Sequence, residues 1–219
     1  MNAVAVGYQA TIENLSPEMP LVLKNIGWDE YVRISDEIGQ RPGARVTFDQ
    51  GRLEIMTLSP EHEAPSRLFT HLISVIVEEM GLDYISLGST TLRLKKISGG
   101  LEPDDCYYIG DFSAVAGIKK MDLTVYPPPD LAIEVDISHA SHSKFRIYAG
   151  LGVKELWLFD GKVLEFHSLA ASGYVAIQAS GLFPFLTPDE LPTFLEKGLN
   201  EGIVSMRRAF REWVQANLI

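Results

Sequence analysis

The segment from Pro129 to Asp160 constrains the fold most, because it places charged residues inside an otherwise apolar strand. It reads PDLAIEVDISHASHSKFRIYAGLGVKELWLFD, which predicts a buried strand, a short helix and a second strand. Glu134 and Asp136 lie on one face of the first strand, about 7 Å apart, because side chains alternate along a strand. Neighbouring buried carboxylates need a cation or a shared proton. Lys144, in the helix that follows, can supply that cation, so the segment indicates a metal-dependent active site.

The length and composition are those of an ordinary globular protein. At 219 residues, 46% of them hydrophobic, the chain can form one sizeable core. It has no apolar run of about 20 residues, which a membrane span needs. The N-terminus lacks the basic and apolar regions of a secretory signal. One cysteine, Cys106, excludes an internal disulfide and a cysteine-rich zinc site, and we interpret it as a small buried hydrophobe. We therefore expect a cytoplasmic protein.

The formal net charge of −10 bears on nucleic-acid binding. Affinity for a phosphate backbone comes largely from Lys and Arg, so this charge argues against a protein that coats DNA. It does not exclude a nuclease, since a local basic patch or bound metal ions can neutralise the carboxylates. The one compact basic cluster is Arg207, Arg208 and Arg211 on the last predicted helix. We interpret it as the solvated face of that helix, with DNA contact as the less favoured alternative.

The chain before the organising segment reads as mixed helix and strand. After an irregular arm over 1–25, the pattern predicts a short helix, a β-hairpin and a long helix. Two short strands and an extended LEPDDCYYIG segment follow, with a turn at Ser98-Gly99-Gly100 and a loop over 111–128. The expected ranges are 28–38 for the helix, 44–57 for the hairpin, 60–80 for the long helix, and 84–87 and 90–94 for the strands.

The chain after Gly152 reads as a strand, a hairpin and then helices. We expect a strand over 155–159, a tight turn at Asp160-Gly161, a partner strand over 163–167 and an edge strand over 174–179. Helices are expected over 188–197 and 202–218. The last helix carries an apolar stripe that would pack on the domain or on another subunit, and it suggests a homodimer. Its members are Ile203, Met206, Phe210, Trp213 and Val214.

The organisation follows from these elements. We expect an N-terminal arm and short helix over 1–40, a core over 41–180, and a C-terminal helical extension over 181–219. The extension would belong to the same domain or form a dimer contact.

Three segments in order carry a family resemblance: a helical EHE, an extended EPDD, and PDLAIEVD followed by a helical K-x-x-x-Y. From about Ile34 to Ala179 the chain resembles the Uma-type restriction endonuclease family of the PD-(D/E)XK nuclease superfamily. The resemblance implies an α/β (α+β) fold, with a mixed central sheet flanked by helices, an N-terminal hairpin and C-terminal helices. It also implies Mg²⁺-dependent hydrolysis of phosphodiester bonds.

The resemblance assigns roles by position. Asp104 corresponds to the motif aspartate, Glu134 to the acidic residue of the (D/E)XK element, and Glu63 to the acidic residue of the preceding helix. The lysine expected two residues after Glu134 is Asp136 in this chain, and Lys144 fits the displaced lysine role. A Mg²⁺ ion, with Mn²⁺ as substitute, would be held by Asp104 and Glu134, with Glu63 reaching it through water or assisting a second ion.

Several assignments have plain alternatives. Only one of Asp104 and Asp105 can face the site, because neighbours on a strand point to opposite faces. Asp136 is either a third ligand or a partner of Lys144, and Lys144 itself could be a solvated helix residue. Glu63 could simply favour the helix dipole. Tyr148, one turn after Lys144, is a possible site residue but more often belongs to a core.

A zinc site is the remaining metal hypothesis. His62, His139 and His142 are spaced unlike any recognised zinc motif, and we expect them at the surface.

The residues and the resemblance together favour a DNA endonuclease. The alternatives are a non-cutting binding or assembly protein on the same scaffold, and a metal-dependent hydrolase of a smaller phosphate ester.

Overall fold

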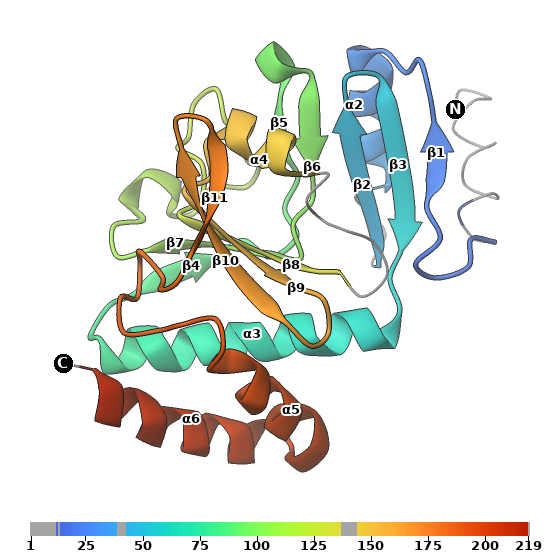
Figure 1. Cartoon of the computed structure of the whole chain (residues 1–219). Helices are drawn as coiled ribbons and strands as arrows, with labels where there is room; N and C mark the ends of the chain where they lie inside the picture. Colours follow the sequence, from blue (N-terminus) through green and yellow to red (C-terminus); the bar gives the residue numbers. More distant parts are fainter. Residues whose placement is uncertain (1–11, 13, 39–42, 137–143, 219) are drawn as a thin grey trace.

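Helices cover both faces of a mixed sheet in the computed structural model, which describes residues 12, 14–38, 43–136 and 144–218. The strands form a six-stranded sheet and a separate five-stranded sheet. Helix α3 (Pro60–Glu79) lies along one face of the six-stranded sheet, and α4 (Phe145–Leu151) lies on the other (Figure 1). The predicted mixed sheet flanked by helices is therefore confirmed.

The six-stranded sheet has the order β11-β10-β9-β8-β7-β4. Only β8 and β9 pair in parallel, with α4 in the connection between them, as a crossover requires. The other neighbours are antiparallel. The bounds are β4 Tyr84–Ser86, β7 Asp105–Ile109, β8 Leu131–Val135, β9 Glu155–Phe159, β10 Leu164–Ala170 and β11 Gly173–Ile177.

Alternation along β8 decides which side chains reach which helix. Leu131, Ile133 and Val135 pack in the core that includes α3. Ala132 packs in the core that includes α4 residues, and Glu134 shares that face because it lies two residues further along. The apolar sequence of β8 thus reflects burial on both faces, and it carries one carboxylate to the α4 side.

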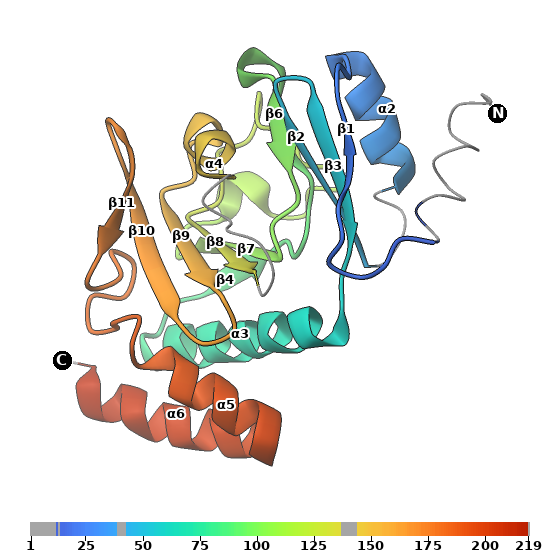
Figure 2. The ribbon, with the colours of Figure 1, turned by 45° about the vertical axis from the view of Figure 1, so that its right-hand side comes forward.

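The five-stranded sheet is antiparallel, with the order β1-β3-β2-β6-β5. Helix α2 (Trp28–Ile38) packs on one face of it, where the Tyr31 and Phe48 rings stack with centroids 4.4 Å apart. Figure 2 shows this sheet standing over one end of α3, beside the six-stranded sheet. The bounds are β1 Leu21–Leu23, β2 Ala44–Asp49, β3 Arg52–Thr57, β5 Leu92–Leu94 and β6 Gly99–Leu101.

The predicted hairpin is confirmed, and Gln50 and Gly51 form its turn. Gln50 and Gly51 have φ values of 47° and 92°, and two positive φ values are what a two-residue turn between twisted strands requires.

Two expectations for the first half of the chain are wrong. Leu21–Leu23 forms strand β1 on the edge of β3, within the stretch expected to be irregular. Gly99 and Gly100 are not in a turn but in β6, paired with Asp49 and Phe48. A Cβ at Gly100 would overlap the Tyr31 hydroxyl, so the glycine is needed for close packing of α2 rather than for a bend.

The C-terminal helices α5 (Leu191–Glu201) and α6 (Ile203–Asn217) pack under α3, as Figure 1 shows. Met206, Phe210 and Val214 are buried in the core that α3 shares with the six-stranded sheet. Three of the five stripe residues are therefore covered by the chain itself, whereas Ile203 is 41% exposed, and the predicted homodimer loses most of that support. Among the described helices, none is both long and apolar enough to cross a membrane.

The basic cluster of α6 has local partners. Arg211 Nε lies 2.8 Å from Glu79 Oε1, and Arg207 Nη2 lies 3.4 Å from Glu78 Oε1, both on α3. These contacts are consistent with a solvated helix face that also bridges to α3. The boundaries proposed at residues 40 and 180 stay predictions.

Candidate active site

Glu134 on β8 and Asp104, directly before the neighbouring strand β7, lie at the α4 face of the six-stranded sheet. Asp104 immediately precedes β7, and its backbone N–H donates to the carbonyl of Ile133 at 3.1 Å. The backbone N–H of Val135 donates to Asp104 Oδ2 at 2.7 Å. Both acidic residues are buried, with Glu134 only 2% exposed and Asp104 8% exposed. The structure thus brings the two carboxylates close enough for the charge of Glu134 to raise the pKa of Asp104.

Asp105 points to the opposite face, toward α3. Its carboxylate accepts hydrogen bonds from Thr70 Oγ1 at 3.0 Å, from Ser86 Oγ at 2.7 Å and from the Tyr107 hydroxyl. Its hydrogen bonds are those of a buried structural anchor. Of the two aspartates, Asp104 is therefore the one beside Glu134.

Helix α4 and the residue directly before it each contribute one partner to Glu134. Lys144, directly before the helix, places Nζ 2.5 Å from Glu134 Oε2. Tyr148, one turn later, donates its hydroxyl to Glu134 Oε1. Both oxygens of Glu134 are engaged, because residues four apart on a helix present side chains to the same spot. Tyr148 joins the cluster rather than packing only in the core.

His62 was expected at the surface, and that expectation is wrong. The side chain is 3% exposed, and Nε2 lies 3.3 Å from Asp104 Oδ2. Ser59 caps α3, with Oγ accepting the backbone N–H of His62 at 3.2 Å. This fixed first turn directs His62 inward, which helical spacing in one sequence does not reveal. His139 and His142 lie outside the described residues.

Arg45 is a further member of the cluster that the sequence did not single out. It lies on β2, with Nε 3.6 Å from Asp104 Oδ1 and Nη2 3.7 Å from Glu63 Oε1. Strand alternation was the available signal, because Ala44, Val46 and Phe48 are buried against α2 and place Arg45 on the other face.

Glu63 and Asp136 lie at the margin of the cluster. Glu63 contacts Arg45 and, at 3.4 Å, Arg67 Nη2, so the structure links it to Asp104 only through Arg45. Asp136 lies near enough to Lys144 to favour its charged form. Within the described ranges, no three His, Cys, Asp or Glu side chains are grouped so that they alone could hold a metal ion.

Burial and mutual repulsion shape the ionisation of the cluster. Burial, followed by the charge of Glu134, raises the pKa of Asp104 from 3.8 to about 6. Burial alone would lower the pKa of Lys144, but the charges of Glu134 and Asp104 outweigh it and raise that pKa. Burial, together with the adjacent Glu134, raises the pKa of Tyr148. The ammonium group of Lys144 is therefore held in its charged form beside the carboxyl groups of Glu134 and Asp104.

This donor set fits a hard divalent cation. Mg²⁺ is commonly bound through one or two carboxylates, with water and substrate phosphate completing its coordination. Asp104 and Glu134 supply two such carboxylates, and their mutual repulsion is the interaction that a bound cation would relieve. The catalytic role of each residue stays a prediction.

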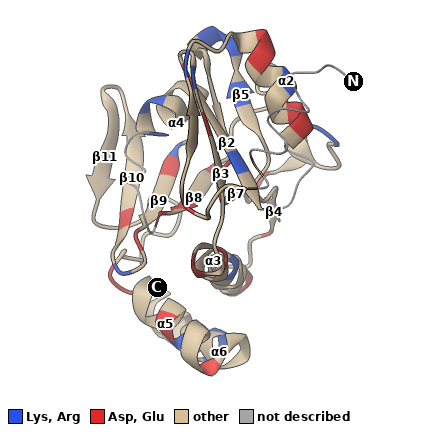
Figure 3. Cartoon of the chain, turned by 90° about the vertical axis from the view of Figure 1, so that its right-hand side faces the viewer, with Lys and Arg blue, Asp and Glu red and all other residues tan. Residues whose placement is uncertain are grey.

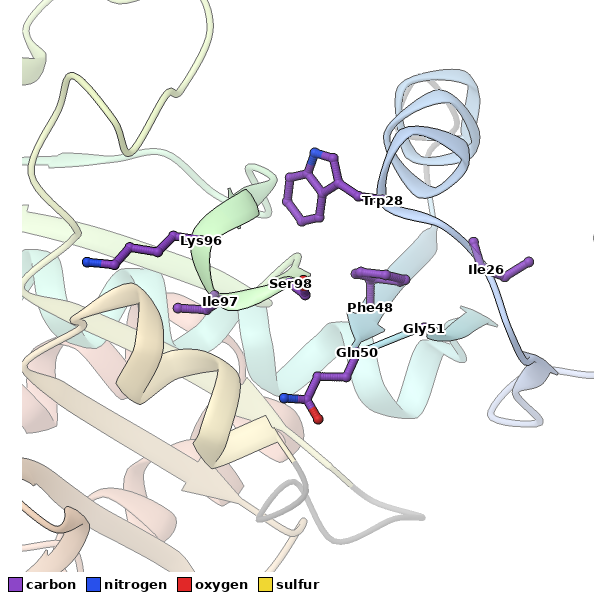
Figure 4. A pocket seen from close by; sticks show the side chains of 8 residues that line it. All are labelled: Ile26, Trp28, Phe48, Gln50, Gly51, Lys96, Ile97 and Ser98. Atoms are coloured by element: carbon purple, nitrogen blue, oxygen red, sulfur yellow. The ribbon is translucent and has the colours of Figure 1, made fainter.

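An open hollow of about 480 Å³ lies elsewhere, between the start of α2, the β2–β3 turn and Ser98 (Figure 4). Trp28 and Phe48 form its apolar wall, and the side chain of Lys96 points away from them. Phe48 is on the opposite face of β2 from Arg45, so this hollow is not the carboxylate site. In Figure 3, Lys and Arg are interspersed with Asp and Glu rather than gathered on one face.

A comparison with models of protein families agrees with the resemblance seen in the sequence. The family model described as "Uma2: Putative restriction endonuclease" matches residues 28–200. Among solved structures, the crystal structure of "a putative nuclease belonging to DUF820" from Anabaena variabilis matches with a TM-score of 0.49 and 15% sequence identity, over 73% of this chain and 97% of that chain. No curated protein matches the sequence significantly. Because the family match covers more than half of the chain, including the whole cluster around Asp104 and Glu134, the chain belongs to the Uma2 family.

Proposed function

We propose that this protein is a metal-dependent endonuclease that hydrolyses phosphodiester bonds of DNA. The observation that carries the proposal is the buried pair of Glu134 on β8 and Asp104 directly before β7, with Lys144 Nζ 2.5 Å from Glu134 Oε2. Family membership supports a nuclease activity. Mg²⁺, or Mn²⁺ in its place, is the cation that these oxygen donors would hold.

The residues of the cluster have different roles in the proposed reaction. Asp104 and Glu134 would hold the cation, which when bound supplies charge stabilisation for phosphate oxygens and lowers the pKa of water. Lys144 would orient the attacking water or neutralise charge that develops on the phosphate. Tyr148 fixes the orientation of Glu134 through its hydroxyl. Glu63 would act at the edge of the site, through water or on a second ion.

The acidic surface is compatible with this function if cation binding and local basic groups offset it. Because the formal net charge is −10, we do not expect strong binding to DNA in the absence of metal. We therefore expect DNA affinity to depend on divalent cation and to fall with salt. The homodimer that many such nucleases need stays a prediction, and light scattering on the purified chain would test it.

One observation favours a second candidate, a scaffold of the same fold that binds but does not cut. Lys144 and Tyr148 already engage both oxygens of Glu134, so a cation would have to share or displace them. A lysine held this tightly can replace a metal ion as the counter-charge. The two candidates differ in one measurable property, which is stabilisation by divalent cation.

The test combines thermal unfolding with cleavage of supercoiled plasmid. Wild type, Asp104→Asn, Glu134→Gln and Glu155→Gln would be compared with Mg²⁺, Mn²⁺ or a chelator. Glu155 is a matched control, because it is buried but bonds to Trp157 and Ser180 away from the cluster. We expect wild type and Glu155→Gln to nick the plasmid and to be stabilised by cation, whereas the two site variants do neither.

The outcomes separate the candidates. Stabilisation without plasmid nicking, together with hydrolysis of an activated small phosphodiester, would indicate the smaller-substrate hydrolase. Wild type that neither binds cation nor cuts would support the non-cutting scaffold. Site variants that cut as well as wild type would contradict the assignment of Asp104 and Glu134.

A further inference from the structure

Arg45 is a basic side chain at the carboxylate cluster whose hydrogen-bonding capacity is largely unused. Within the described part of the chain, its guanidinium donates one hydrogen bond, from Nη1 to the carbonyl of its neighbour Ala44 at 3.2 Å. Its Nε is buried and has no hydrogen-bond partner. A guanidinium has five N–H donors in a rigid fork, so most of the donors of Arg45 have no acceptor among the described residues.

The nearby carboxylates compensate the charge of Arg45 but do not satisfy its donors. The distances of 3.6 Å to Asp104 Oδ1 and 3.7 Å to Glu63 Oε1 are those of ion pairs, beyond the range of N–H···O hydrogen bonds. A side chain that served only to neutralise these carboxylates would be expected to form close, paired hydrogen bonds with one of them. With the side chain only 14% exposed, water has limited access to replace that partner.

The two oxygens of Asp104 are used unequally. Oδ2 accepts the backbone N–H of Val135 at 2.7 Å and lies 3.3 Å from His62 Nε2. Among the described residues, Arg45 approaches Oδ1, and none donates a hydrogen bond to it. The oxygen of Asp104 that is free to bind a cation is therefore the one next to the unused donors of Arg45.

We propose that Arg45 binds a non-bridging phosphate oxygen of the substrate beside the cation-binding carboxylates. The inference rests on the proposed function and identifies a phosphate-binding residue on the five-stranded sheet. A phosphate oxygen is a charged acceptor, and an arginine fork matches it better than it matches a carboxylate held too far away. Arg45 and Lys144 would then supply the two positive side chains of the site, one from β2 and one from the segment before α4.

The test compares Arg45→Met and Arg45→Lys with Arg52→Met. Arg52 is a matched control on the adjacent strand β3, 53% exposed and paired with Glu54. Three quantities would be measured for each protein: the rise in unfolding temperature with Mn²⁺ alone, the affinity for a DNA duplex with Ca²⁺, and kcat/KM for cleavage with Mg²⁺. Folding would be checked by thermal unfolding without metal.

We expect Arg45→Met to keep the Mn²⁺ stabilisation of wild type and to lose about 100-fold in kcat/KM, with weaker DNA binding. Arg45→Lys should recover part of the loss, because lysine keeps the charge but not the fork. Arg52→Met should stay within about twofold of wild type.

Each contrary result has a distinct meaning. Active wild type with an equally active Arg45→Met would overturn the inference and leave the proposed function intact. Loss of the Mn²⁺ stabilisation in Arg45→Met would also overturn it, since Arg45 would then act by arranging the carboxylates. Wild type that neither cuts nor binds DNA would remove the proposed function and this inference together.

Discussion

Replacing Asp104 by asparagine should make the metal-free protein more stable while abolishing cation binding. The pKa of Asp104 is raised from 3.8 to about 6, first by burial and then by Glu134, so the folded state holds its proton more tightly than the unfolded state. A group of this kind contributes stability below about pH 4, and that stability is lost as pH rises through about 6. At pH 8 the loss corresponds to about 3 kcal/mol, from roughly 1.4 kcal/mol for each pKa unit.

Asparagine removes this loss because it does not ionise. Its amide oxygen can still accept the Val135 N–H, which Asp104 Oδ2 accepts at 2.7 Å in the wild type. The advantage of Asp104→Asn over wild type should therefore grow by roughly 1.5 kcal/mol between pH 5 and pH 8, and reach about 3 kcal/mol at pH 8. A functional residue whose removal stabilises the fold is a recognised trade between stability and activity.

Urea denaturation in chelator at pH 5, 6, 7 and 8 would measure the effect. Asp105→Asn is the control, because its carboxylate accepts hydrogen bonds from Thr70, Ser86 and Tyr107, and losing them should destabilise by about 1–3 kcal/mol. Saturating Mn²⁺, at about 100 times its Kd, should add about 2.7 kcal/mol to wild type and nothing to Asp104→Asn. Parallel pH profiles for wild type and Asp104→Asn would refute the reasoning about burial and repulsion.

Two further predictions concern contacts around the same cluster and sheet. Lys144→Met leaves the Glu134 carboxylate buried without its ammonium partner, so we expect a loss of about 3–5 kcal/mol in chelator and partial recovery with Mn²⁺. Urea denaturation would check this, and a loss below 1 kcal/mol would contradict it. Gly100→Ala should cost about 2 kcal/mol or more, because the new Cβ would overlap the Tyr31 hydroxyl and lie 2.7 Å from Arg93 Cβ. Thermal unfolding should show a smaller cost in a Tyr31→Phe background, and equal costs in both backgrounds would count against the packing argument.

The sequence was most informative where periodicity and charge agree. The bounds of α2 and β9 match the expected ranges, and the hairpin, α3 and β8 were also predicted from apolar spacing. These elements bury a regular face, and that regularity is visible in one sequence. The structure was needed to choose between Asp104 and Asp105. The alternation of side chains along a strand predicts that the two point to opposite faces of the sheet, but it does not predict which of them faces α4.

Tertiary pairing accounts for what the sequence missed. Strand β1 has three half-buried residues, and its pairing with β3 is not encoded in any local pattern. Gly99 and Gly100 resemble a turn locally, yet both pair with β2 in β6, where Gly100 leaves room for Tyr31 of α2. His62 and Arg45 reach Asp104 from α3 and β2 respectively, and only the three-dimensional fold brings them there.

A single short stretch of chain fixes the site relative to both sheets. Leu101 ends β6 in the five-stranded sheet and Asp105 begins β7 in the six-stranded sheet, so only three residues connect them. Glu102 accepts the backbone N–H of Val46 on β2 at 3.2 Å, while Asp104 accepts that of Val135 on β8 at 2.7 Å. Glu102 therefore anchors the connection to the five-stranded sheet, and Asp104 anchors it to the six-stranded sheet. Burial raises the pKa of both carboxyl groups. Because Arg45 precedes Val46, the hydrogen bond that Glu102 accepts from Val46 holds β2 next to Arg45. Glu102 also accepts a hydrogen bond from Thr91 Oγ1 at 3.0 Å, so its carboxylate has a structural role in the five-stranded sheet that differs from the role proposed for Asp104.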